Sequence, residues 1–327
     1  MIIADDDLVR RHLDWPQLIS ALADMFRSGC RVGPRIHHEL AVPDAQDGTL
    51  LLMPAWTTGR FIGVKVATVF PGNAALGLPS VSASYLMFDG KNGTPLACME
   101  ASVLTAKRTA AASALAARHL ARPDAAKLLL VGTGRVAREL AHAHAAVRTI
   151  RRVEVWGRDF AKAERLAFEL SKEGCDVVAV PDLRAAAGEA DVISCATLSK
   201  EPLLHGNWIA PGTHVDLVGA FKPNMREADE ALMRRASIFV DTRTGALTEA
   251  GDIVIAIERG AITAECIRAD LAELVAGTHP GRQGQRDITV FKSVGTASED
   301  LAAAVLVYEQ LVRGRAATND PIAGIIA

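Results

Sequence analysis

The fold is decided by one stretch of the sequence, Lys127-Leu-Leu-Leu-Val131 followed by Gly132-Thr-Gly134-Arg-Val-Ala137. Its first part is a short apolar run that ends at a glycine, which is typical of a strand buried on both faces of a sheet. A helical pattern follows from Arg138 to Val147. A strand, a tight turn and a helix in this order predict the first β-α unit of a doubly wound domain.

The segments downstream repeat this alternation. They are short β-rich runs, and the residues between them are numerous enough to form crossover helices or loops. We therefore expect an α/β fold in which a Rossmann-type, doubly wound parallel sheet spans residues 121–294. The further strands predicted for this sheet are Val153–Trp156, Val177–Val180, Val192–Cys195, Val215–Val218 and Ile238–Val240.

The residues upstream follow a different pattern. Strand-like segments at 50–54, 61–70 and 82–90 are bounded by Gly, Pro and Asn turns, as in an antiparallel α+β domain, and an alanine-rich helix is predicted over 105–118. Near the end of the chain, Thr296-Ala-Ser-Glu299 fits a capping box that opens a last helix. We expect this helix to return to the first domain, which would then be discontinuous and comprise residues 1–120 and 295–327.

Composition excludes several classes of protein. The chain has 327 residues, enough for two domains, and its net charge of −2 provides no cationic field for nucleic acid or anionic lipid. It has no apolar run of the length that a membrane span needs, and its N-terminus carries an acidic triplet, Asp5–Asp7, where a signal peptide would be basic. The five cysteines never form a C-x-x-C pair, and the histidine pairs 37/38 and 142/144 lack a third ligand, so no metal is expected. A cytoplasmic protein without nucleic-acid or membrane partners is the expectation.

The glycine turn predicts a dinucleotide site. Gly132 makes the tight turn, Gly134 lets the backbone approach a diphosphate, and the small Ala137 permits close packing of helix on strand. At the tip of the second strand stand Gly157 and Arg158, with Lys162 one turn further on, where NAD enzymes usually carry an acidic residue. Because a guanidinium pairs with a 2′-phosphate, NADPH is favoured and NADH is the weaker alternative. The alternative for Arg158 is a solvated surface charge, and Asp159 is expected to cap the next helix.

Further cofactor contacts are expected from the turn itself and from loops that follow the strands, because ligands of such sheets bind at the carboxyl ends of the strands. Each of these residues could instead have only a structural role in its turn. They are Thr133, Arg135, Val136, Ala196, Thr197, Leu198, Val218, Gly219, Lys222, Ser293, Gly295 and Thr296.

Four motifs outside the turn resemble those of the ornithine cyclodeaminase/mu-crystallin family, and the resemblance covers nearly the whole chain. It implies a homodimer whose α+β domain binds the substrate and forms the interface, beside a Rossmann domain that carries a nicotinamide. The motifs are Gly63-Val-Lys65, Leu104-Thr-Ala-Lys-Arg108-Thr-Ala-Ala, Val218-Gly-Ala-Phe-Lys-Pro-Asn-Met-Arg-Glu227 and Phe291-Lys-Ser-Val-Gly-Thr296.

The resemblance also implies site residues. Arg35, Lys65 and Arg108 would be the cations that bind the substrate carboxylate, with Lys65 catalytic and Arg108 also near the cofactor, and Ser80 would reach the cofactor. An arginine fork suits a carboxylate, and Lys65 interrupts an apolar run in which an unpaired lysine would be costly. The alternatives are a solvent-facing Lys65, if its place in the strand alternation puts it there, and a surface Arg108.

One departure from the family distinguishes two chemistries. Its cyclodeaminases carry an aspartate where Phe221 stands, and phenylalanine cannot transfer a proton. The run 216–227 most resembles the branch of Δ1-pyrroline-2-carboxylate and Δ1-piperideine-2-carboxylate reductases, which implies a small cyclic imino acid as substrate and a place in proline and hydroxyproline metabolism. NADPH-dependent reduction of such imines is therefore expected. The alternatives are an ornithine cyclodeaminase, an alanine dehydrogenase and a crystallin-like NADPH-binding protein without activity.

Overall fold

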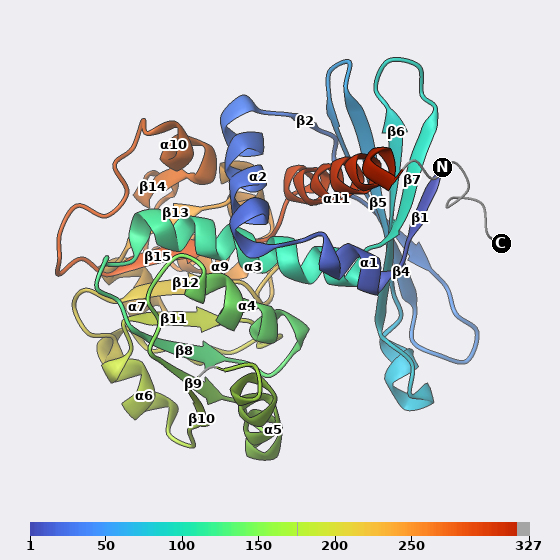
Figure 1. The fold of residues 1–327 in the computed structure, drawn as a ribbon. Helices are drawn as coiled ribbons and strands as arrows, with labels where there is room; N and C mark the ends of the chain where they lie inside the picture. The colour runs from blue at the N-terminus through green and yellow to red at the C-terminus, as the bar shows by residue number, and fades with distance from the viewer. Residues whose placement is uncertain (175, 319–327) are drawn as a thin grey trace. The chain divides into compact units, whose positions relative to one another are not determined.

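The computed structural model describes residues 1–174 and 176–318, and its chain divides into two units (Figure 1). One comprises Met1–Arg108 with Thr296–Ala327, and the other Thr109–Gly295. The first break falls inside helix α3 (Ser102–Leu120) and the second lies just before helix α11 (Ala297–Thr318). We refer to them as unit 1 and unit 2.

Unit 2 is built on an eight-stranded parallel sheet in the order β10-β9-β8-β11-β12-β15-β13-β14. The order reverses between β8 and β11, so the doubly wound α/β fold expected from the sequence is confirmed. The strands are β8 (Lys127–Val131), β9 (Arg152–Trp156), β10 (Val177–Ala179), β11 (Val192–Cys195), β12 (His214–Leu217), β13 (Ser237–Val240), β14 (Ile267–Asp270) and β15 (Thr289–Lys292).

The helices of unit 2 connect these strands. The glycine turn leads into α4, and α5 begins where Asp159 accepts the Lys162 N–H at 3.3 Å, so the capping role expected for Asp159 is confirmed. The remaining elements are α4 (Arg135–Ala145), α5 (Phe160–Ser171), α6 (Leu183–Glu189), η2 (Gly206–Trp208), α7 (Glu230–Arg235), α8 (Arg243–Thr248), α9 (Gly251–Glu258), η3 (Ala264–Cys266) and α10 (Leu271–Ala276).

The central strands of this sheet have no exposed face. Every residue of β11, β12 and β15 is buried, as expected for the central strands of a parallel sheet that is covered on both faces. Strands β14 and β15 were not predicted. Their sequences, Ile-Arg-Ala-Asp and Thr-Val-Phe-Lys, are only four residues long and include charged residues, so the apolar signal of each strand is weak.

Unit 1 contains a seven-stranded sheet in the order β1-β7-β6-β5-β4-β2, with β3 also paired to β4. All pairs are antiparallel except β1 with β7. Its elements are β1 (Ile2–Ala4), α1 (Asp6–Arg11), α2 (Trp15–Ser28), β2 (Arg31–Val32), β3 (Ile36–Leu40), β4 (Gly48–Thr57), β5 (Phe61–Val69), η1 (Pro71–Leu76), β6 (Val81–Asp89), β7 (Pro95–Glu100), the first residues of α3, and α11.

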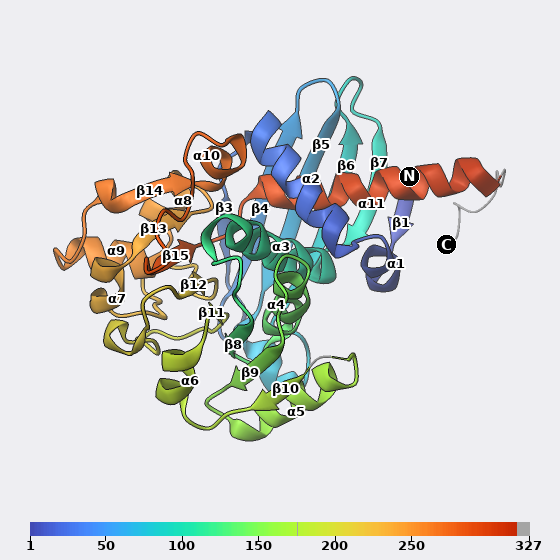
Figure 2. The same cartoon turned by 60° about the vertical axis from the view of Figure 1, so that its left-hand side comes forward.

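Helices α2 and α11 lie side by side across one face of this sheet (Figure 2). Met53 and Ala55 of β4 pack there against Ala297 and Leu301 of α11. The last helix therefore returns to the first part of the chain. Among the described residues, no helix has both the length and the apolar character that a membrane crossing requires.

The opposite face of the same sheet is apolar and only half-buried in a single chain. The even-numbered residues of β4, β5 and β6 point to it because side chains alternate along a strand, and their pairing register places them side by side. We call this surface the outer face, and define it by Leu52, Ile62, Val64, Val66, Leu86 and Phe88.

Candidate functional site

Two buried cations and two buried carboxylates meet in unit 1. Lys65 and Arg108 are each 4% exposed. The Lys65 Nζ atom lies 2.8 Å from Asp300 Oδ2, and the Arg108 Nε donates a hydrogen bond of 2.8 Å to Asp300 Oδ1. The Arg108 Nη1 also donates to Glu299 Oε2 at 2.5 Å. Asp300 thus bridges the two cations that were expected to bind substrate.

Strand alternation and helix position bring these four groups together. Lys65 pairs with Met53 on β4 and Tyr85 on β6, so its side chain points to the face that α2 and α11 cover. Glu299 and Asp300 occupy the first turn of α11, where the helix dipole favours negative charge. The solvent-facing alternative for Lys65 and the surface alternative for Arg108 are both excluded by their burial.

Burial and charge shift the ionisation of this cluster. Burial lowers the pKa of Lys65 to about 8; the charge of Asp300 opposes this shift, whereas those of Arg108 and Arg35 add to it. Burial favours the neutral form of Asp300, yet the charges of Arg108 and Lys65 hold the pKa of this carboxyl below its usual value. Burial raises the pKa of the Tyr85 phenol, and Asp300 adds to the rise. Lys65 is therefore a cation that can give up its proton near neutral pH.

Arg35 is half-buried near the start of β3, close enough to Lys65 to influence its pKa. The sequence motifs predict the three cations but not their partners Glu299 and Asp300. Glu299 was expected to take part in the helix cap, whereas its Oε2 atom binds Arg108. The available signal was physical: two cations buried in an apolar domain need carboxylates, and the adjacent pair 299/300 stands directly before the apolar run 301–307.

In unit 2, the glycine turn has the geometry that a diphosphate requires. Gly132 has φ +123°, and a Cβ atom there would lie 2.6 Å from the Ala196 carbonyl oxygen. Gly134 is the N-cap of α4 and supplies no side-chain hydrogen bond, and a Cβ atom on it would meet nothing within 4 Å. The space beside Gly134 at the start of α4 is therefore open, and it lies at the positive end of the helix dipole, which fits an anionic diphosphate.

The predicted 2′-phosphate residues stand at the tip of β9. Arg158 and Lys162 are exposed, and Gly157 is half-buried. The Lys162 Nζ lies 3.8 Å from Asp159 Oδ2 on the surface. Two exposed cations at this tip are compatible with a phosphorylated ribose.

The other predicted cofactor residues divide between the two units. Ser80, Arg108 and Thr296 belong to unit 1, and the rest to unit 2. Leu198 is 73% exposed and Lys222 is exposed. Three positions have backbone N–H groups that bind buried carboxylates, namely Thr197 and Gly219 to Glu227, and Gly295 to Asp241.

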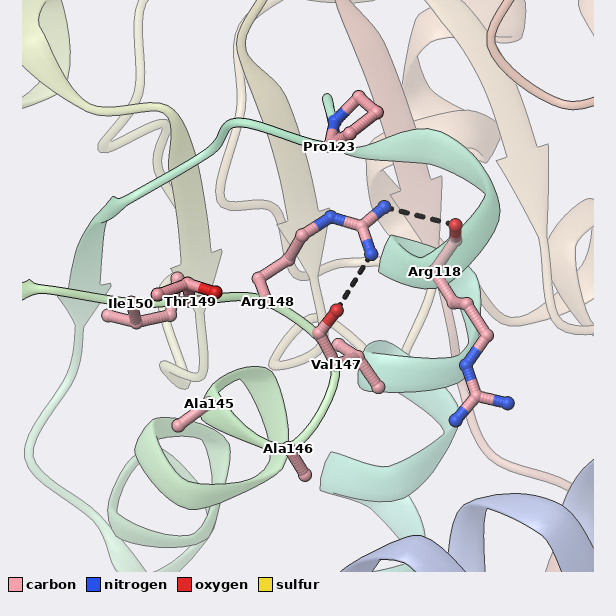
Figure 3. Close-up of a pocket in the computed structure, with 8 residues that line it drawn as sticks. All are labelled: Arg118, Pro123, Ala145, Ala146, Val147, Arg148, Thr149 and Ile150. Atoms are coloured by element: carbon pink, nitrogen blue, oxygen red, sulfur yellow. Dashed lines mark hydrogen bonds between the residues drawn. The ribbon is translucent and has the colours of Figure 1, made fainter.

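A surface hollow of about 710 Å³ in unit 2 has none of these residues in its lining (Figure 3). Arg118, Pro123 and residues 145–150 line it. Arg148 donates there to the carbonyl oxygens of Val147 at 2.8 Å and Arg118 at 3.0 Å, and also to that of Ala117 at 2.8 Å. This arginine caps the C-terminal end of α3, and we assign the hollow a structural role.

Comparison with known proteins identifies relatives across the length of the chain. The model of the ornithine cyclodeaminase/mu-crystallin family matches residues 8–315. A Δ1-pyrroline-2-carboxylate reductase of Paracoccus denitrificans is 47% identical over 258 residues, which are 79% of this chain and 82% of the relative.

Two solved structures share the fold. The Thermococcus litoralis Δ1-pyrroline-2-carboxylate reductase, in complex with NADH and L-proline, superposes with a TM-score of 0.91 at 36% identity, covering 96% of this chain and 98% of that one. An archaeal alanine dehydrogenase dimer with bound NAD has a TM-score of 0.88 at 29% identity, covering 96% and 97% of the two chains. Both neighbours bind a nicotinamide dinucleotide.

Proposed function

Because the chain belongs to the ornithine cyclodeaminase/mu-crystallin family, we propose that it reduces cyclic α-imino acids with NADPH. The substrates are Δ1-pyrroline-2-carboxylate, giving L-proline, and Δ1-piperideine-2-carboxylate, giving L-pipecolate. The observation that carries this proposal is the buried cluster of Lys65, Arg108 and Asp300 in unit 1. The reductases named above, which are 36% and 47% identical to this chain, support it.

In this reaction, bound NADPH supplies a hydride to C2 of the imine. The chain's own residues supply charge and a proton. Arg108 makes its contacts with Glu299 and Asp300 through Nη1 and Nε, so its Nη2 is the nitrogen that we assign to the substrate carboxylate, together with Arg35. Burial lowers the pKa of Lys65 to about 8. The Lys65 ammonium group therefore holds a proton that can pass to the nitrogen side of the imine as the hydride arrives.

Phe221 favours reduction over ammonia elimination. It stands where the family's cyclodeaminases carry an acid/base aspartate, it is 39% exposed, and it has no group that exchanges a proton. An imine that arrives protonated needs no further acid for hydride transfer.

The activity test compares three reactions. We expect the purified chain to oxidise NADPH in the presence of Δ1-pyrroline-2-carboxylate, to release no ammonia from L-ornithine with NAD, and to form no NADH from L-alanine with NAD. Ammonia from ornithine would establish the cyclodeaminase alternative, and NADH formation with alanine would establish the dehydrogenase. Dinucleotide binding without turnover of any of these would favour a binding protein.

Arg158→Ala is expected to reverse the cofactor preference. Loss of a charge-assisted pair with the 2′-phosphate, about 1.5–3 kcal/mol, should lower kcat/KM for NADPH by roughly 10- to 100-fold and leave NADH within about twofold. Initial rates with each cofactor at saturating imine measure this effect. Arg165→Ala, an exposed arginine on α5, is the matched control. An equal loss with both cofactors would refute the assignment of Arg158.

We also propose that the chain is a homodimer that pairs through its outer face, in keeping with the dimeric alanine dehydrogenase neighbour. A half-buried apolar sheet face of this kind needs a covering surface. Val64→Asp would place a charge in the middle of this face and is expected to shift the chain to monomers, as measured by light scattering during gel filtration. Asn92→Asp, in the turn between β6 and β7, should leave the mass unchanged. A wild-type monomer at micromolar concentration would contradict the proposal.

A further inference from the structure

One buried carboxylate in unit 2 holds two loops of the sheet edge together. Glu227 Oε1 accepts hydrogen bonds from the Thr197 N–H at 2.7 Å and the Thr197 hydroxyl at 2.8 Å. Its Oε2 accepts the Gly219 N–H at 2.7 Å. Thr197 follows β11 and Gly219 follows β12, so a single side chain connects the two loops. They touch so closely that a Cβ atom on Gly219 would lie 1.9 Å from the Thr197 carbonyl oxygen.

Glu227 is itself held by a second buried carboxylate. Asp252 Oδ1, at the start of α9, accepts the backbone N–H groups of Glu227 at 2.7 Å and Ala228 at 2.9 Å. The Nζ of Lys292, the last residue of β15, lies 3.1 Å from Asp252 Oδ2, and neither side chain has any exposed area. Glu227 and Lys292 belong to two of the family motifs, and neither residue was among the predicted cofactor contacts.

The position of the Glu227 contacts relates them to the dinucleotide. The loops lie at the carboxyl ends of β11 and β12, beside the point where the strand order reverses, and open α/β sheets bind ligands there. The β11 loop also adjoins the glycine turn, since a Cβ atom on Gly132 would lie 2.6 Å from the carbonyl oxygen of Ala196. A shift of this loop would therefore disturb the turn that we assign to the diphosphate.

We propose that ionised Glu227 is a positioning residue for the cofactor, which fixes the loops after β11 and β12 in the form that binds the dinucleotide. This inference rests on the proposed function. Glu227 acts through Thr197 and Gly219 and need not touch the cofactor. Its three partners are all donors, so both carboxylate oxygens must accept. A protonated carboxyl or an amide would place a hydrogen against one of these N–H groups.

The surroundings of Glu227 make this arrangement sensitive to pH. Burial raises the pKa of Glu227 to about 7; Lys292 and the Thr197 donors oppose the rise and Asp252 adds to it. The other titratable groups nearby are Cys195 and Asp241. Burial and the charge of Glu227 raise the pKa of the Cys195 thiol, and burial raises the pKa of Asp241, a rise that its backbone N–H donors and the charge of Lys292 oppose. If only the ionised form positions the loops, dinucleotide affinity falls as pH drops through about 7, by up to tenfold per pH unit. Binding below that pH must then release a proton.

The experiment measures the dissociation constant of NADH by fluorescence between about pH 6 and pH 8.5, where NADH itself has no titrating group. NADPH is unsuitable because its 2′-phosphate titrates in this range. For the wild type we expect NADH to bind more weakly below about pH 7, and we expect proton release on binding, as measured by calorimetry in two buffers of different ionisation enthalpy.

Glu227→Gln is expected to bind NADH at least about tenfold more weakly than the wild type at pH 8, with an affinity that does not depend on pH. Glu201→Gln, an exposed carboxylate two residues after Ser199, is the matched control and should match the wild type.

The outcomes separate this inference from the proposed function. Thermal unfolding without NADH shows whether Glu227→Gln folds, and if it does not, the wild-type pH profile and proton release decide alone. A pH-independent wild-type affinity, or Glu227→Gln with wild-type affinity, overturns the positioning role even where the imine is reduced. Absence of imine turnover in a chain that shows the expected pH profile overturns the proposed activity alone. A wild-type chain that binds neither NADH nor NADPH at any pH overturns both.

Discussion

Asp300→Asn is expected to lower kcat/KM for Δ1-pyrroline-2-carboxylate by at least about 100-fold, because Lys65 loses the carboxylate that keeps it charged and oriented for proton transfer. Removal of one partner from a buried ion pair should also lower the free energy of unfolding by roughly 3–5 kcal/mol. The amide leaves Lys65 beside Arg108 and Arg35 without the carboxylate that lies 2.8 Å from its Nζ. In the wild type, activity that needs the Lys65 ammonium is lost as pH rises through its pKa of about 8. Without Asp300 this pKa falls further, so the alkaline limb of the pH profile of kcat/KM moves to lower pH.

Glu309→Gln is the matched control for this variant, because it changes a carboxylate of the same helix that is 3.7 Å from Arg60 on the surface. Its rates should stay within about twofold of the wild type, as exposed ion pairs contribute little. Thermal unfolding of Asp300→Asn measures how much folded protein remains. An alkaline limb at the wild-type pH would show that Asp300 does not control the ionisation of Lys65.

Gly132→Ala is expected to abolish dinucleotide binding and to lower the free energy of unfolding of the chain by about 2–4 kcal/mol. The residue has φ +123°, a conformation that alanine rarely adopts, and its Cβ would lie 2.6 Å from the Ala196 carbonyl oxygen. The β8–α4 turn or the β11 loop would have to move to relieve this contact. Urea unfolding without cofactor and titration with NADPH measure the two effects.

Gly134→Ala separates the two effects. Its φ is −85°, and its Cβ would meet nothing within 4 Å, so the fold should tolerate the methyl group. If the diphosphate occupies that open space, the methyl group weakens NADPH binding by at least about tenfold while the free energy of unfolding stays within about 1 kcal/mol. Unchanged NADPH affinity in Gly134→Ala would mean that the diphosphate does not approach the turn.

Much of the architecture of unit 2 was predictable because its signals are local. The apolar run of β8, the glycine turn and the pattern of α4 are adjacent in sequence, and the doubly wound fold inferred from them and from the following strands is confirmed. The order of the last strands was not predictable. Strand β15 lies between β12 and β13 although β13 and β14 precede it in the chain, and no local pattern determines which neighbour such a strand joins.

The site was predictable only in part, for a related reason. The cations Lys65 and Arg108 were found through motifs, and the structure brings them together. Their carboxylates lie 191 and 192 residues away from Arg108, beyond any periodicity in the sequence. Glu227 was likewise missed, because its role depends on loops that follow two different strands.

The same separation in sequence orders the events of biosynthesis. Lys65 and Arg108 leave the ribosome long before Glu299 and Asp300, which α11 brings to the first part of the chain. Until then, neither cation can be buried without a large desolvation cost, so unit 1 of a nascent chain stays open at its future centre. A chain cut before residue 296 would keep Lys65 and Arg108 but would lack Glu299 and Asp300, the two carboxylates that compensate their charges. Synthesis of α11 is therefore the step that closes this centre, and quality control by proteolysis would remove copies that lack this helix first.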